Sequence, residues 1–183
     1  MTGVQTCALP ICLRRGERIA LVTDAGSPGI SDPGERVVKA VLAAGFRVEA
    51  VPGPCAMVAA LTAGGLPTRE FHFVGFLPHK SGQRRSRLAS LRSIPGTLVI
   101  YESPFRVEKL MAELNDIFPG QSVVLARELT KKFEEYLRGT TEELLLITKK
   151  RRLKGEFVVL IDNAPGNHPS GTPPAEPQGF RLD

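Results

Sequence analysis

The stretch Arg18-Ile-Ala-Leu-Val-Thr-Asp-Ala-Gly-Ser-Pro-Gly-Ile-Ser-Asp-Pro-Gly-Glu35 decides the fold class of this chain. It opens with a short apolar run that ends at Asp24, which is typical of a buried strand. A loop rich in glycine and proline follows, and the spacing of Asp32 and Glu35 then predicts a helix N-terminus with a capping box. A strand, a loop and a helix in this order indicate an α/β fold with backbone amides exposed at the carboxyl edge of a sheet.

The rest of the chain continues this alternation, and parallel strands joined by right-handed crossovers are expected. The apolar runs predict strands over residues 18–24, 46–51, 71–77, 97–102, 123–127 and 157–161. Helices are predicted from Asp32 to Gly45, over residues 55–63 and 83–92, and from a cap at Ser103-Pro104 to residue 117. In the last of these, Val107, Leu110, Met111 and Leu114 share an inward face. Thr140 and Glu143 predict a second capping box.

Two small α/β domains in series are therefore expected, with a ligand cleft between them. The domain ranges are 13–69 for a partial N-terminal domain and 70–163 for a C-terminal domain. Residues 1–12 have neither a periodic pattern nor the features of a signal peptide, so we expect a non-native leader there. Residues 164–183 contain five prolines and three glycines, which predicts a disordered tail.

The composition is that of a globular chain and excludes several classes of protein. Of 183 residues, 42% are hydrophobic and 23% are charged, which argues against a disordered or collagen-like chain. No apolar run reaches the ~18 residues that a membrane span needs. Three cysteines are too few for a disulfide framework or a zinc site, so no metal is expected and the cytoplasm is the expected compartment. The net charge of +5 permits a polyanionic partner.

Seven motifs follow one another along the chain: the loop Asp24–Gly34, Val51-Pro-Gly-Pro-Cys-Ala56, Leu61-Thr-Ala-Gly-Gly-Leu-Pro67, Gly75-Phe-Leu-Pro78, Tyr101-Glu-Ser-Pro-Phe-Arg106, Ala126-Arg-Glu-Leu-Thr-Lys131 and Lys154-Gly-Glu156. In this order they resemble the ribosomal RNA small-subunit methyltransferase I family. The resemblance implies the tetrapyrrole-methylase fold, with S-adenosylmethionine in the cleft between the domains. It also implies 2′-O-methylation of a cytidine in 16S ribosomal RNA, and a homodimer. The family's first strand and its P-I-G-N-L-type glycine loop are not found in this sequence, so the first domain is expected to be incomplete and the chain an N-terminally truncated fragment.

Carried over residue by residue, the resemblance implies a set of cofactor contacts. They are Asp24, Ala25, Gly26, Ser27, Pro28 and Ile30 in the loop, Cys55 and Ala56 at the next helix start, and Tyr101 and Glu102 in the second domain. Methyl transfer to a ribose hydroxyl also needs a group that accepts a proton. Glu102, Glu128 and Lys154 are the candidates, and the sequence does not choose among them. A structural ion pair is the simpler interpretation of Glu128, and a solvated charge that of Lys154.

Basic residues gather in two segments, residues 80–92 and 149–154, and such clusters neutralise phosphates. The candidate RNA contacts are Lys80, Arg84, Arg85, Arg106 and Lys131. Few aromatic residues lie near the clusters in sequence, which favours phosphate contacts over base stacking. A solvated basic face is the alternative interpretation of each cluster.

Two other functions remain open at this stage. A methyltransferase of the same fold acting on a tetrapyrrole or on a modified protein histidine is one, although the basic segment 83–92 argues against a small acidic macrocycle. A catalytically silent RNA-binding or dimerisation module is the other. Because strands missing from a sheet leave apolar surface exposed, we also expect the chain to be poorly soluble as a monomer.

Overall fold

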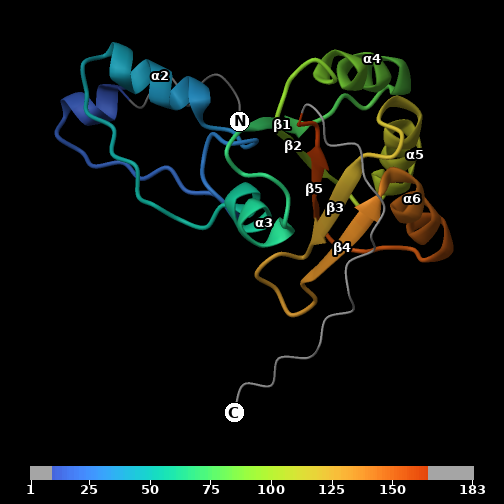
Figure 1. Ribbon diagram of the computed structural model, residues 1–183. Helices are drawn as coiled ribbons and strands as arrows, with labels where there is room; N and C mark the ends of the chain where they lie inside the picture. Colours follow the sequence, from blue (N-terminus) through green and yellow to red (C-terminus); the bar gives the residue numbers. More distant parts are fainter. Residues whose placement is uncertain (1–9, 165–183) are drawn as a thin grey trace. The chain divides into compact units, whose positions relative to one another are not determined.

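The computed structural model describes residues 10–164, which divide into one compact unit up to Ala59 and another from Ala60 (Figure 1). The predicted leader, apart from residues 10–12, and the predicted tail, apart from Ala164, lie outside the described residues. The domain ranges 13–69 and 70–163 stay predictions. Among the described residues, no helix is long and apolar enough to cross a membrane.

The first unit contains a short helix over residues 10–14 and the helix α2, Glu35–Ala43, joined by loops. The predicted cap at Asp32 is wrong, because α2 is preceded by Gly34 and no side chain caps it. Ser31 has a left-handed backbone conformation, with φ 53°, so the chain is still turning when it reaches Asp32. The capping box with Glu35 therefore does not form.

The predicted strands over residues 18–24 and 46–51 are also wrong, since neither segment pairs with a strand among the described residues. Several of their apolar side chains are open to solvent, with Val22 79% and Val51 89% exposed. An apolar run shows that side chains favour burial, but a strand forms only where a second backbone supplies the hydrogen bonds.

The second unit is built on a mixed sheet in the order β1-β2-β5-β3-β4, which confirms the α/β class. The strands are β1 (Phe71–Phe76), β2 (Thr97–Glu102), β3 (Ser122–Arg127), β4 (Glu135–Thr140) and β5 (Phe157–Asp162). Only β1 and β2 are parallel, and every other pair is antiparallel. The expectation of parallel strands fails here because β4, which the sequence analysis missed, returns directly from β3 as a hairpin.

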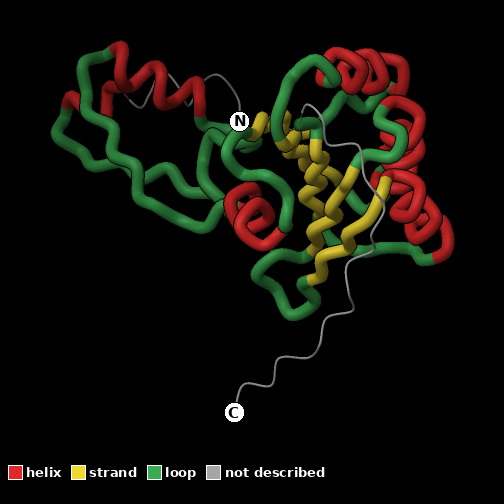
Figure 2. The backbone as a smooth tube through the Cα atoms, viewed as in Figure 1, coloured by secondary structure: helices red, strands yellow, loops and turns green. Residues whose placement is uncertain are grey.

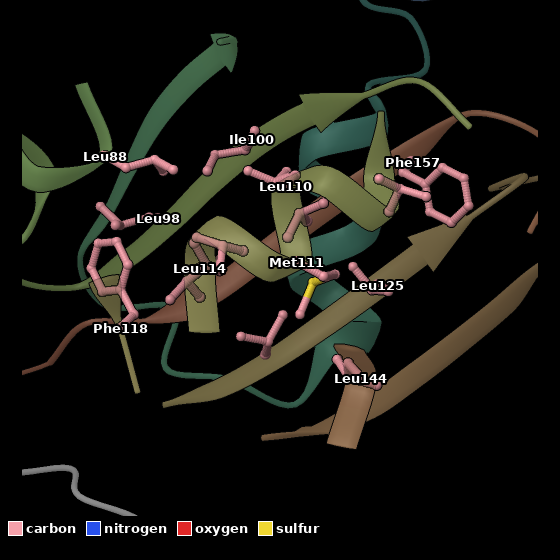
Figure 3. Close-up of a cluster of buried hydrophobic side chains, with 14 of the residues drawn as sticks. Leu88, Leu98, Ile100, Leu110, Met111, Leu114, Phe118, Leu125, Leu144 and Phe157 are labelled. Carbon is pink, nitrogen blue, oxygen red and sulfur yellow. The ribbon is translucent and has the colours of Figure 1, made fainter. Parts of the chain in front are cut away.

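Three helices cover one face of this sheet: α4 (Ser81–Leu91), α5 (Val107–Ile117) and α6 (Thr141–Lys150) (Figures 1 and 2). The predicted inward face of α5 is confirmed, since its four apolar residues are at most 3% exposed. They pack on alternate residues of the strands, including Leu98, Ile100 and Leu125 (Figure 3). The predicted capping box of α6 is also confirmed, with Thr140 and Glu143 exchanging hydrogen bonds. The predicted cap of α5 is wrong, because α5 begins after Arg106 without a side-chain cap.

The other face of the sheet is covered at β5 by the last turn of α3, Ala56–Gly64. A Cβ atom on Gly64 would lie 2.6 Å from the Leu160 side chain, so the helix backbone rests directly on the strand. Arg138 of β4 donates hydrogen bonds to the carbonyl oxygens of Ala63 (2.6 Å) and Gly64 (3.0 Å). These bonds satisfy carbonyl groups that a helix end leaves without partners.

A buried ion pair fastens α4 to α5. Arg84 donates from Nε and Nη2 to the two carboxylate oxygens of Glu113, at 2.5 and 2.8 Å. Ser81 donates to the same carboxylate at 2.8 Å. Burial alone would raise the pKa of Glu113, but the hydrogen bonds from Arg84 and Ser81 outweigh it and lower the pKa. Arg84 is only 4% exposed, so the structure places this expected RNA contact inside the unit.

We predict that Glu113→Gln lowers the free energy of unfolding at neutral pH by about 3 kcal/mol, because it leaves the buried Arg84 charge without its partner. The folded-state pKa of Glu113 is lowered, so its contribution is present above the unfolded value of ~4.3 and is lost as the pH falls through the folded value. Urea unfolding of the parent chain and of E113Q, at pH 7 and at acidic pH, measures this difference in the free energy of unfolding. Asp116→Asn, which breaks the exposed pair with Arg85, is the control and costs under ~1 kcal/mol. Identical pH slopes for E113Q and the parent chain would contradict the assignment.

We predict that Gly96→Ala destabilises the second unit by about 2 kcal/mol or more. Gly96 has φ +92°, and an added Cβ would lie 2.5 Å from the Glu70 carbonyl oxygen, which accepts the Thr97 N–H. Gly82→Ala in α4 is the matched control, because its Cβ meets nothing within 4 Å and alanine is the better helix former. Thermal unfolding of both variants measures the difference. Equal stability of G96A and the parent would show that the turn relaxes freely.

Candidate functional site

The strand register brings most of the predicted site residues of the second unit to one edge of its sheet. Phe76 pairs with Tyr101, Glu102 with Phe157, and Arg127 with both Phe157 and Glu135. The loops 77–80, 103–106, 128–134 and 151–156 therefore leave the sheet at the same side, where β1, β2 and β3 end. We call this side the carboxyl edge. Four strand spacings make it about 19 Å long.

At the β1–β2 end of the carboxyl edge, Arg106 joins the two strands. Its Nη2 donates to Glu102 Oε2 and to the carbonyl oxygen of Leu77, both at 2.9 Å. Its Nη1 lies 3.0 Å from His79 Nδ1. The Glu102 side chain is 1% exposed, and its other oxygen accepts from the Ser103 N–H. Both carboxylate oxygens of Glu102 are thus used within the protein.

At the β3–β5 end, Glu128 and Lys131 form a second charged group. Glu128 Oε1 accepts from the Glu156 N–H at 3.1 Å and from Lys131 Nζ at 3.2 Å, and Lys131 also contacts the Glu156 carboxylate at 3.0 Å. The backbone hydrogen bond from Glu156, followed by that from Lys131, lowers the pKa of Glu128. Hydrogen bonds from Lys131 to Glu156 and Glu128 raise the pKa of Lys131, so both groups are held in their charged forms.

The backbone beneath this second group is unusual. Glu128 and Thr130 have φ of 49° and 63°, a left-handed conformation that is uncommon for residues other than glycine. Gly155 has φ +91°, and an added Cβ would lie 2.4 Å from the Glu128 Oε1 atom. A side chain at position 155 would therefore displace the Glu128 carboxylate. Such strain is often found at functional sites.

Lys154 lies in the loop before β5 with an exposed side chain, and its carbonyl oxygen accepts from Arg127 Nη1 at 2.7 Å. Arg127 also pairs with Glu135 at 2.6 Å, and Arg151 pairs with the same carboxylate. Burial would raise the pKa of Glu135, but the hydrogen bonds from Arg127 and Arg151 outweigh it and lower the pKa. These ion pairs fix the loop backbone and leave the Lys154 ammonium facing outward.

The remaining candidate RNA contacts have different environments. Lys80 is exposed at the carboxyl edge, in the loop that joins β1 to α4. Arg85 lies on the surface of α4, where it pairs with Asp116 at 2.8 Å. Lys131 is 49% exposed and Arg106 16%. The structure thus brings Lys80, Arg106 and Lys131 to one edge, but places Arg85 on a helix and Arg84 inside the unit.

In the first unit, the loop from Asp24 to Gly34 is open and lies against α2. Pro28, Gly29 and Ile30 form one side of a shallow groove, and the other side comes from α2 with Glu35, Val38, Lys39 and Leu42. Gly26 has φ +70°, and nothing lies within 4 Å of a Cβ built there. Asp24 and Ala25 are exposed and Ser27 is half-buried, as is Cys55, while Ala56 is exposed. An open backbone of this kind lets a ligand approach closely.

Sequence analysis missed three residues of the carboxyl edge. From the sequence, His79 was expected to be a solvated loop residue that could touch RNA, whereas in the structure its Nδ1 lies 3.0 Å from Arg106 Nη1. Glu156 supplies both a backbone donor and a carboxylate to the Glu128–Lys131 group, and Gly155 leaves the space that this group needs. The available signal was the Lys154-Gly-Glu156 motif itself, because a glycine between two charged residues indicates a close backbone approach.

A sequence profile of the tetrapyrrole (corrin/porphyrin) methylases matches residues 5–145. A Xylella fastidiosa protein named ribosomal RNA small subunit methyltransferase I is 47% identical over 152 residues, covering 81% of this chain and 56% of that protein. A Micromonospora olivasterospora protein of the same name is 42% identical over 157 residues, covering 85% and 50%. The chain thus spans about half the length of the curated relatives it matches.

Solved structures share the fold at low sequence identity. The methyltransferase CobJ superposes with a TM-score of 0.65 at 21% identity, covering 87% of this chain and 70% of CobJ. The uroporphyrin-III C-methyl transferase of Thermus thermophilus, complexed with S-adenyl homocysteine, has a TM-score of 0.57 at 20% identity, covering 87% and 73%. The α/β fold and the profile match over most of the chain agree, and the chain belongs to the tetrapyrrole (corrin/porphyrin) methylase family.

Proposed function

We propose that this chain acts as an S-adenosylmethionine-dependent methyltransferase that methylates the 2′-hydroxyl of a cytidine in 16S ribosomal RNA. The observation that carries the proposal is the identity of 42–47% to proteins named ribosomal RNA small subunit methyltransferase I, over more than four-fifths of the chain. The cations of the carboxyl edge support it, because Lys80, Lys131 and Lys154 suit a polyanionic substrate.

The first unit offers residues that fit the cofactor. The exposed backbone of Gly26 leaves open space beside the loop, and the apolar groove at Pro28 and Ile30 suits the uncharged parts of a nucleoside. Bound there, S-adenosylmethionine supplies a methyl group already activated for transfer. We assign its binding to Asp24, Ala25, Gly26, Ser27, Pro28 and Ile30, with Cys55 and Ala56. The Tyr101 and Glu102 contacts remain predictions.

The charged groups of the carboxyl edge suit positioning better than proton transfer. Glu102 is buried and bound to Arg106, so its role is to hold that guanidinium in place. Glu128 has a lowered pKa, which makes it a weak base, and it holds Lys131. We propose that Lys131 and Lys154 bind phosphates and orient the ribose, while Arg106 supports the loop that follows β1.

The RNA reaction is preferred over methylation of a tetrapyrrole. Structural neighbours named as uroporphyrin-III or cobalt precorrin-4 methyltransferases are only 17–22% identical to this chain, which is evidence of a shared fold rather than a shared substrate. We further propose the small ribosomal subunit as the partner, a homodimeric state and a cytoplasmic location. Sedimentation of the full chain at several concentrations checks the homodimer, and a monomer at all of them contradicts it.

We predict that the full chain binds S-adenosylmethionine in calorimetric titration and that Gly26→Ala weakens binding by about tenfold or more. The new methyl group would occupy the space that the ligand needs, at a backbone angle that favours glycine. Gly45→Ala is the matched control, because Gly45 has φ +82° and is equally open but ends α2. Equal affinity of the two variants would show that the cofactor does not bind at this loop.

The substrate is tested by the transfer of labelled methyl groups. We expect transfer to small-subunit RNA and not to a uroporphyrinogen, and the reverse preference overturns the proposal.

We predict that Glu128→Gln raises KM for RNA while leaving kcat within about threefold, because Glu128 acts by holding Lys131. Lys131→Met should give a similar rise in KM, and the double variant should be no worse than either single one. Steady-state kinetics of the parent, the two single variants and the double variant complete this double-mutant cycle. A fall in kcat of about 100-fold in E128Q alone would instead make Glu128 the proton acceptor.

A further inference from the structure

Three large apolar side chains stand exposed along the carboxyl edge. Phe76, at the end of β1, is 58% exposed, and Phe105 and Phe133, in the loops after β2 and β3, are 80% and 64% exposed. They are 29 and 28 residues apart in the chain, but the strand register places their loops on one side of the sheet. Single exposed apolar residues need no explanation, whereas a group of phenylalanines at one edge indicates a binding surface.

The two most exposed rings are carried by loops that ion pairs hold in place. Phe105 directly precedes Arg106, whose guanidinium is fixed by Glu102 and by the Leu77 carbonyl oxygen. Phe133 lies in the loop held by the Glu128–Lys131 pair and by the hydrogen bond from the Thr130 N–H to Glu134. A ring presented on a rigid loop loses little conformational entropy when a flat ligand covers it.

Several lysines lie near these rings. Lys132 Nζ lies 5.7 Å from the Phe133 ring centroid. Lys131 lies on the same loop, where it pairs with Glu128 and Glu156, and Lys154 has an exposed side chain on the loop before β5. Lys80 follows β1 at the Phe105 end. Exposed aromatic rings among cations are the chemistry that binds unpaired nucleotides, since bases stack on the rings and phosphates meet the cations. The fold thereby supplies the aromatic residues that the basic segments lack in sequence.

We propose that Phe105 and Phe133 stack on unpaired bases of the RNA, so that the substrate is recognised where it is locally single-stranded. This inference rests on the proposed function and names the state of the RNA that the site takes. Two to three strand spacings separate the two loops, which is about 10 to 15 Å. The rings therefore bind different bases of one strand, and the lysines between them bind the intervening phosphates. A duplex keeps its bases stacked on one another and offers neither ring a free face.

The test is binding of a fluorescent oligocytidine strand to the full chain, compared with the same strand annealed to its complement. Phe105→Leu and Phe133→Leu keep the apolar bulk but remove the aromatic face, and each should weaken single-strand binding by about 5- to 100-fold. Phe105→Tyr and Phe133→Tyr should bind as the parent does. Phe71→Leu is the matched control, since Phe71 is 46% exposed at the opposite end of β1.

A second readout separates stacking from charge. The slope of the logarithm of the affinity against the logarithm of the salt concentration should stay the same in the two leucine variants. In Lys131→Met the slope should fall by about one, because one phosphate contact is lost. A base analogue that is quenched on stacking should lose its quenching in the leucine variants only.

Three outcomes overturn the inference: leucine variants that bind like the parent, duplex bound as tightly as single strand, or leucine variants that dissociate a dimer without changing RNA affinity. The last would make the phenylalanines a contact between two copies of the chain. If the chain methylates small-subunit RNA and one of these outcomes occurs, only this inference fails. If RNA is neither bound nor methylated, the proposed function fails.

Discussion

A buried charge needs a partner, and this constraint organises the second unit. Arg84 and Glu113 tie α4 to α5, and Glu102 and Arg106 tie the end of β2 to the end of β1. Each pair is largely shielded from solvent, so removing one partner leaves an isolated charge that costs several kcal/mol. The loops of the carboxyl edge keep their shape because these pairs hold them, and the exposed residues of the edge depend on that shape.

The distance along the sequence over which a feature is determined explains which parts of the fold were predictable. The inward face of α5 and the capping box of α6 depend on local spacing, and both were predicted correctly. β4 was missed because Glu135-Tyr-Leu-Arg-Gly-Thr140 contains two charges and a glycine, and it becomes a strand only by pairing with β3. The strand predictions for residues 18–24 and 46–51 are wrong for the opposite reason. These segments have the composition of strands but no partner strand among the described residues.

The site residues divide in a similar way. Glu102, Glu128 and Lys131 were proposed because they lie in two of the motifs that resemble the family, Tyr101–Arg106 and Ala126–Lys131. Whether a charge faces solvent or a partner depends on residues far away in the chain, and Arg84, 29 positions before Glu113, shows this most clearly. Phe105 and Phe133 gave no signal, because each is the only aromatic residue in its own loop and only the register of the strands brings the two loops to one edge.

The order of the strands has a consequence for how the protein is made. β5 is the last strand of the described chain but lies in the middle of the sheet, between β2 and β3. During synthesis the β1–β2 pair and the β3–β4 hairpin both emerge before it, each with an unpaired inner edge and an apolar face. The two halves join only after Asp162 has left the ribosome. Until β5 arrives, a nascent chain of this kind exposes the unpaired strand edges and apolar surface that favour aggregation.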